Sequence, residues 1–239
     1  MASNSETGHS VNISNFKLLI DKCTAFGAPY NPSNMRLTIA NMTTLWTTAD
    51  TAHQTLTSAI QSAKNPINDR QILFEPTEKL VTRTLNYFKS TDASDQVKAD
   101  AKGLADRFRG YGVKVDKLPD GTPDPADVST SHQGFVQKAD TFKQLVDLYG
   151  SDANYAPNEA DLKVGELQIL ATAMKTANDN IGTIIAPVGT ARITRDKALY
   201  ADKTGIVDTA QDCKNYVKGV FGASAPETKT VTGIKFTRP

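Results

Sequence analysis

The chain repeats one of its own segments. Tyr30-Asn-Pro32 returns as Tyr155-Ala-Pro157, and at that offset of 125 residues the stretch 30–60 matches without a gap at eight positions. An internal repeat constrains architecture before any single motif does, because each copy must fold by the same rules. The identical pairs are Tyr30/Tyr155, Pro32/Pro157, Leu37/Leu162, Leu45/Leu170, Thr47/Thr172, Thr51/Thr176, Ala52/Ala177 and Ile60/Ile185.

The repetition extends in both directions. Phe16-Lys-Leu-Leu-Ile-Asp21 corresponds to Phe142-Lys-Gln-Leu-Val-Asp147, and Asn86-Tyr-Phe-Lys89 corresponds to Asn215-Tyr-Val-Lys218. The sequence therefore predicts two related helical repeats, a first repeat at 14–110 and a second repeat at 135–239, which either fold separately or pack as one domain. A disordered tail is expected at 1–13, and residues 111–134 have the turn-rich composition of a linker.

Apolar residues recur every three or four positions over most of the chain, which is typical of α-helices. In each repeat a short helix precedes a long one, and shorter helices follow it; the first long helix is expected at about 33–75. We therefore predict an all-α protein whose two repeats are pseudo-symmetric, with short, long and short helices packed as an antiparallel bundle.

Each long helix contains a proline, Pro66 in the first and Pro187 in the second. The heptad pattern of apolar residues keeps its phase across both prolines, which favours kinked but continuous helices. The alternative is that each proline ends its helix, so that the chain turns back there as a hairpin.

Polar residues interrupt the apolar pattern at matching places in the two long helices. His53 occupies the position of Asn178, and Arg70 occupies that of Arg195. The structural interpretation is a polar layer that fixes helix register at some cost in stability. If the long helices run antiparallel, His53 meets Asn178, and Arg70 comes close to Asp161.

The functional interpretation of the same residues is a site for an anion or a small ligand, formed by Arg70, Arg195 and Arg192, because guanidinium groups bind carboxylate and phosphate well. A buried arginine is more often paired with a carboxylate of its own protein. The sequence alone does not decide between a structural polar layer and a ligand site.

No pattern of catalytic or metal-binding residues stands out. The three histidines are scattered, no spacing suits zinc, and the glycines lack the context of a phosphate-binding loop. The two cysteines, Cys23 and Cys213, fit reduced thiols packed among apolar helix positions. We therefore expect no enzyme activity, no metal and no cofactor.

The composition limits the classes of partner that the protein is expected to bind. The net charge is +1, and 22% of the residues are charged, so no global field attracts nucleic acid or an anionic membrane. No apolar run is long enough for a membrane span, and the polar first residues lack a signal-peptide pattern. A cytoplasmic protein is expected.

The first long helix carries an unusual number of threonines on its outer face, with few charges among them. Such a face suits contact with another subunit, although it is equally consistent with a merely neutral exposed surface. The residues are Thr43, Thr44, Thr47, Thr48, Thr51, Thr55 and Thr57.

The openings Tyr30-Asn-Pro-Ser33 and Tyr155-Ala-Pro-Asn-Glu159, together with Asn215-Tyr-Val-Lys-Gly-Val-Phe-Gly222, resemble a family of uncharacterised proteins from Bacteroidetes. The resemblance covers nearly the whole chain and implies an internally duplicated, all-helical protein. It implies no activity and no site residues. The expected function is therefore non-catalytic: a structural, scaffolding or protein-binding role, with self-association. The alternative is a small-ligand or anion-binding protein that uses the repeated arginines between the repeats.

Overall fold

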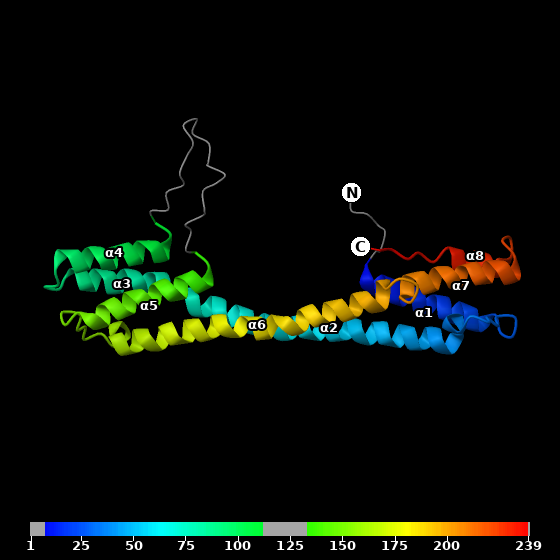
Figure 1. The fold of residues 1–239 in the computed structure, drawn as a ribbon, viewed down its shortest axis with the longest axis horizontal. Coiled ribbons are helices and arrows are strands. Elements are labelled where there is room, and N and C mark those ends of the chain that lie inside the picture. Colours follow the sequence, from blue (N-terminus) through cyan, green and yellow to red (C-terminus); the bar gives the residue numbers. More distant parts are fainter. Residues whose placement is uncertain (1–7, 112–132, 239) are drawn as a thin grey trace, which may run out of the picture. The chain divides into compact units, whose positions relative to one another are not determined.

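The computed structural model describes residues 8–111 and 133–238, and every regular element in these ranges is a helix (Figure 1). The prediction of an all-α protein is confirmed. Most of the predicted linker at 111–134 and the first seven residues of the predicted tail lie outside the described residues. The helices are α1 (His9–Ala25), α2 (Ile39–Phe74), α3 (Thr77–Lys89), α4 (Asp95–Arg109), α5 (Phe135–Ser151), α6 (Val164–Tyr200), α7 (Ile206–Phe221) and α8 (Pro226–Thr232), with one-turn 3₁₀ helices η1 (Met35–Leu37) and η2 (Ala160–Leu162) before α2 and α6.

The chain forms two compact units that do not coincide with the sequence repeats. The first unit combines residues 1–63 with 185–239, and the second unit comprises residues 64–184. Each unit therefore joins the opening of one repeat to the closing part of the other, whereas the sequence placed the divisions near 110 and 135. The reason is that α2 and α6 continue past Pro66 and Pro187 and do not turn back there. The helices that follow each long helix therefore pack with the other repeat.

The two prolines lie inside the long helices. Pro66 is an interior residue of α2, and Pro187 is an interior residue of α6, so the prediction of continuous helices is confirmed and the hairpin alternative is wrong. A proline removes one backbone donor and crowds the preceding turn. The packed residues on both sides of it must offset that cost.

The first unit is organised around α1 and α7. Phe16 and Leu19 of α1 are fully buried against Val217 of α7 and Leu199 of α6. The helix begins at His9, so the prediction of a disordered tail up to residue 13 is wrong for residues 9–13. Asn12, which is 1% exposed, exchanges hydrogen bonds with the backbone of Thr237, and these bonds anchor the first turn.

The second unit has an aromatic core. Phe88 of α3, Phe108 of α4, and Phe142 and Tyr149 of α5 are buried together with Met174 of α6. The helix α4 ends at a glycine, Gly110, whose φ of 77° is a left-handed conformation that suits a helix C-cap.

One local corner occurs in both units. The hydroxyl of Tyr30 donates to the carbonyl oxygen of Leu37 at 2.7 Å, and the hydroxyl of Tyr155 donates to that of Leu162 at 2.9 Å. Both tyrosines are buried, and the bond ties the proline corner to the 3₁₀ turn that precedes each long helix. The repeated Tyr-x-Pro segment therefore has a structural role.

Candidate functional site

The predicted polar layer of the first unit contains His53 and Arg195. Arg195 is 9% exposed, and its Nε and Nη2 atoms donate to the neighbouring Asp196 carboxylate at 2.9 and 2.6 Å. The Nδ1 atom of His53 is buried and has no hydrogen-bond partner among the described residues. Nearby, Nδ1 of His9 lies 2.8 Å from the hydroxyl of Tyr200. Burial and the charge of Arg195 lower the pKa of His9, which favours its neutral form.

The layer of the second unit contains Asn178 and Arg70 and is built on Phe135. The amide nitrogen of Asn178 donates to the carbonyl oxygen of Phe135 at 2.9 Å. The guanidinium of Arg70 lies over the Phe135 ring at 4.2 Å, a cation–π contact. The Nε of Arg70 and the Oδ1 of Asn178 are both buried without a partner among the described residues.

The structure pairs these residues differently from the prediction. The carboxylate of Asp161 accepts from Arg83 of α3, so the predicted approach of Arg70 to Asp161 is wrong. The cause is that α3 packs beside η2, the turn that carries Asp161. His53 belongs to the first unit and Asn178 to the second.

The three arginines proposed as ligands differ in their surroundings. Arg195 is paired with a carboxylate of its own chain, Arg192 is exposed, and Arg70 is half-buried on an aromatic ring. Of these, Arg70 retains a buried donor without a protein acceptor among the described residues.

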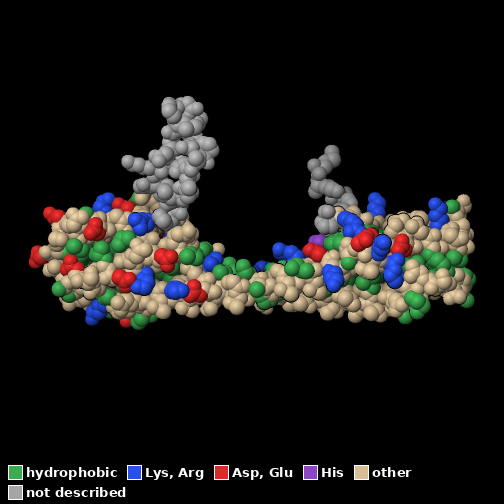
Figure 2. Space-filling view, viewed as in Figure 1, with side chains coloured by type: hydrophobic (Ala, Val, Ile, Leu, Met, Phe, Trp, Pro, Cys, Tyr) green, Lys and Arg blue, Asp and Glu red, His purple; other side chains and the backbone are tan. Residues whose placement is uncertain are grey.

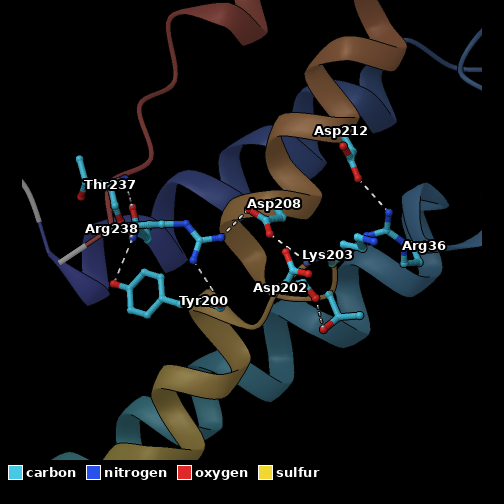
Figure 3. Close-up of polar contacts among 10 residues, drawn as sticks. Arg36, Tyr200, Asp202, Lys203, Asp208, Asp212, Thr237 and Arg238 are labelled. Carbon is cyan, nitrogen blue, oxygen red and sulfur yellow. Dashed lines mark hydrogen bonds and ion pairs between the residues drawn. The ribbon is translucent and has the colours of Figure 1, made fainter.

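Sequence reasoning missed a cluster of charged residues at the connection between α6 and α7, shown in Figure 3. Arg238 donates to the carbonyl oxygen of Tyr200 at 3.0 Å and to the Asp208 carboxylate at 2.6 Å. Asp208 also accepts from the backbone nitrogen of Lys203 at 2.9 Å. The Arg238 guanidinium holds the pKa of Asp208 below its ordinary value.

Arg36 approaches the same connection from η1. It donates to the Asp212 carboxylate at 2.8 Å and also to the backbone carbonyl of Lys203 (Figure 3). Lys203 has a φ of 61°, an uncommon conformation for a residue with a side chain. The cluster fixes this turn and the end of the chain by charge-assisted hydrogen bonds. Its carboxylates Asp208 and Asp212 each accept from an arginine of the cluster.

The threonine face of α2 consists of Thr43, Thr44, Thr47, Thr48, Thr51, Thr55 and Thr57, all of which are exposed. Six of their hydroxyls donate to the carbonyl oxygen four residues earlier in the same helix, for example Thr44 to Ala40 at 3.0 Å and Thr48 to Thr44 at 2.9 Å. Between Ile39 and Ala63 the helix has one charged residue, Asp50. This face therefore presents methyl groups and little charge.

Two surface grooves of the second unit are lined entirely by described residues. One, of about 400 Å³, lies between α5 and α6 and is edged by the ion pair of Lys143 with Asp147 and by Lys175. The other, of about 480 Å³, lies between α3 and α6 over Leu80, Leu167 and Leu170.

The described surface mixes charges of both signs. The face shown in Figure 2 carries acidic and basic side chains close together and no broad patch of one sign. Among residues 8–111 and 133–238, no group of three or more His, Cys, Asp or Glu residues could hold a metal ion. None of the helices described in the structure is long and apolar enough to cross a membrane.

Comparison with known proteins gives no relative to argue from: no protein-family model, no curated protein and no solved structure matches the chain.

Proposed function

We propose that this is a non-catalytic structural or scaffolding protein of the cytoplasm that binds other protein surfaces, and in the first instance a second copy of itself, through the threonine face of α2. The observation that carries the proposal is the hydrogen bonding of the threonine hydroxyls within their own helix.

Burying a hydroxyl is costly when its hydrogen bond to water is lost without replacement. On this face six of the seven threonine donors are already satisfied by the carbonyl oxygens of the preceding turn, so covering them removes few bonds to water. Asp50, the single charge on this stretch, accepts from the Gln54 side chain at 2.7 Å. Ile60, one turn beyond Thr57, is 37% exposed and extends the face with an apolar side chain. A partner surface of similar character would therefore lose little on desolvation.

We further propose that the two units are pseudo-symmetric copies of one arrangement, as the duplicated sequence suggests. The equal hydrogen bonds of Tyr30 and Tyr155 support this.

The test is the mass of the protein in solution as a function of concentration, measured by sedimentation velocity. We expect the wild type to form larger species as concentration rises. The triple variant T44K/T48K/T51K places three positive charges on one side of α2 and should remain monomeric at the same concentrations. Lysine is a better helix former than threonine, so the variant should stay folded.

A matched control uses Thr190 and Thr194 of α6, which are exposed and also donate to the carbonyl four residues earlier. The double variant T190K/T194K should associate as the wild type does. A wild type that stays monomeric throughout, or a control variant that dissociates equally, would remove the support for this surface.

The alternative function, binding of a small anion or polar ligand, is favoured by one observation in the second unit. Arg70 offers a buried Nε donor and Asn178 a buried Oδ1 acceptor, and both residues contact Phe135. Titration with inorganic phosphate or acetate, followed by calorimetry, should then give saturable heat in the wild type and none in Arg70→Met. No heat in the wild type would leave this layer with a structural role alone.

A further inference from the structure

The two cysteines of the chain lie side by side in the core of the first unit. The Sγ atoms of Cys23 in α1 and Cys213 in α7 are 3.5 Å apart, although 190 residues separate them in sequence. Both thiols are free, and their side chains are 1% and 0% exposed. The hydroxyl of Tyr30 lies 3.4 Å from the Cys213 sulfur.

Packing at this place does not require thiols. By the offsets of the repeat, Cys23 corresponds to Tyr149 and Cys213 to Thr84. In the second unit these two residues are also neighbours, with the Tyr149 hydroxyl 3.4 Å from the Thr84 hydroxyl oxygen. The same layer is thus filled in one unit by a ring and a hydroxyl, and in the other by two sulfurs within reach of each other.

We propose that Cys23 and Cys213 form an oxidative modification site, at which a hydroperoxide converts the two thiols to a disulfide that joins α1 to α7. This goes beyond the proposed binding function and does not depend on it. Hydrogen peroxide is small and uncharged, so it can enter during brief openings of the core that would exclude a larger oxidant.

The reaction balances in two steps. The thiolate of one cysteine attacks a peroxide oxygen, which breaks the O–O bond and gives a sulfenic acid and hydroxide. The second sulfur then attacks the sulfenic sulfur as its own proton is lost, which forms the S–S bond and expels the hydroxyl group. The protein loses two electrons and two protons, and the peroxide is reduced to two molecules of water.

The geometry favours Cys213 as the sulfur that reacts first. The hydrogen bond with the Cys23 thiol and the positive charge of the adjacent Lys214 lower the pKa of Cys213. The hydrogen bond to Cys213 and burial raise the pKa of Cys23. Cys23 is therefore the resolving thiol.

The disulfide would hold the opening of the first repeat to the closing part of the second. Cross-linking residues that are far apart in sequence restricts the unfolded chain strongly, so thermal unfolding should shift upward by about 5–10 °C. The shift should disappear on reduction.

The experiment treats the intact protein with hydrogen peroxide and follows the intact mass, the free thiols under denaturing conditions and the unfolding midpoint. The expected result is loss of two hydrogens at the Cys23–Cys213 peptide pair, no remaining free thiol, and a raised midpoint that a phosphine reductant reverses. Persistence of both thiols, or their oxidation to sulfinic acids without an S–S bond, would overturn the proposal.

Single variants test the order of the two steps. In Cys23→Ser, which keeps a hydrogen-bond donor beside Cys213, the remaining Cys213 should accumulate a sulfenic acid that dimedone captures, whereas Cys213→Ser should react much more slowly. Equal trapping in both variants would contradict the assigned roles. The wild-type measurement stands even if a variant folds poorly.

Discussion

Arg36 and Asp212 form an ion pair of 2.8 Å in the first unit, and at the corresponding positions of the second unit the two charges are exchanged. The repeat aligns Arg36 with Asp161 and Asp212 with Arg83. Asp161 and Arg83 are themselves paired, with one of the two contacts at 3.3 Å. The same contact, between a 3₁₀ turn of one repeat and the short helix that follows the long helix of the other repeat, is therefore made twice, with opposite polarity.

The exchange of the two charges distinguishes the observed pairing, in which segments of different repeats pack together, from a pairing inside each repeat. In the observed fold the opening of each repeat packs with the closing part of the other. If each repeat folded back on itself near its proline, Arg36 would face Arg83, and Asp161 would face Asp212. Exposed ion pairs contribute only about 0–1 kcal/mol to stability. Their effect here is to oppose the wrong pairing with like charges.

We expect the double variant R36D/D212R to lose this discrimination. It keeps an ion pair in the first unit, but it makes both the native and the self-folded pairings attractive. Its stability should stay within about 1 kcal/mol of the wild type, while refolding from denaturant should yield more misassembled or aggregated protein by size-exclusion chromatography.

The fourfold variant R36D/D212R/R83D/D161R is the matched control, because it restores like charges in every self-folded pairing. It also loses the Arg36 bond to the Lys203 carbonyl, as the double variant does. Its refolding yield should return to the wild-type level. Equal yields for the two variants would show that the exchanged charges do not direct assembly.

The free energy of unfolding at alkaline pH should depend on Tyr149. Burial raises the pKa of Tyr149 to about 12, from an ordinary value of 10.0. The unfolded chain therefore ionises first, so this contribution is fully present below pH 10 and is lost as the pH rises toward 12. The slope is roughly 1.4 kcal/mol per pH unit for one group. Tyr149→Phe should lose less stability than the wild type between pH 8 and pH 11.5, as measured by urea unfolding. A parallel decline in both proteins would contradict the assignment, since other buried tyrosines contribute to each alike.

The helices could be predicted from sequence, but their partners could not. The heptad phase across Pro66 and Pro187 carried enough information to show that the long helices continue. Periodicity shows that a helix has a buried face without showing which helix covers it. Asn12 illustrates the limit, since its backbone partner Thr237 lies at the other end of the described chain.

For the candidate sites too, the sequence indicated the residues but not their partners. Sequence symmetry drew attention to His53, Asn178, Arg70 and Arg195 because they break an apolar pattern at matching positions. It could not place Asp196 as the acceptor for Arg195, or Phe135 beneath Arg70, since those contacts depend on the rotation of each helix and on the exchanged packing.

The corners at Tyr30 and Tyr155 allow a test of whether the two repeats are structurally equivalent. Tyr30→Phe and Tyr155→Phe each remove a buried hydroxyl that donates to a carbonyl, at Leu37 and Leu162 respectively. Leaving a buried carbonyl without its donor costs about 1–3 kcal/mol. Both variants should therefore be destabilised by similar amounts in chemical unfolding. A loss in one and none in the other would mean that the two corners are not equivalent.

Replacing Pro187 should stabilise the protein. Pro187 is exposed inside α6, where the ring leaves the Thr183 carbonyl without its helical donor. Pro187→Ala restores that bond and removes the clash, although the freed chain gains entropy when unfolded. A net gain of about 1–2 kcal/mol is expected from helix propensity. Gly189→Ala is the control, because Gly189 is exposed in the same helix and an added Cβ meets nothing within 4 Å. It should gain about 1 kcal/mol or less. If Pro187→Ala were destabilising in urea unfolding while Gly189→Ala was not, the bend at Pro187 would be a feature that the packing of α6 requires.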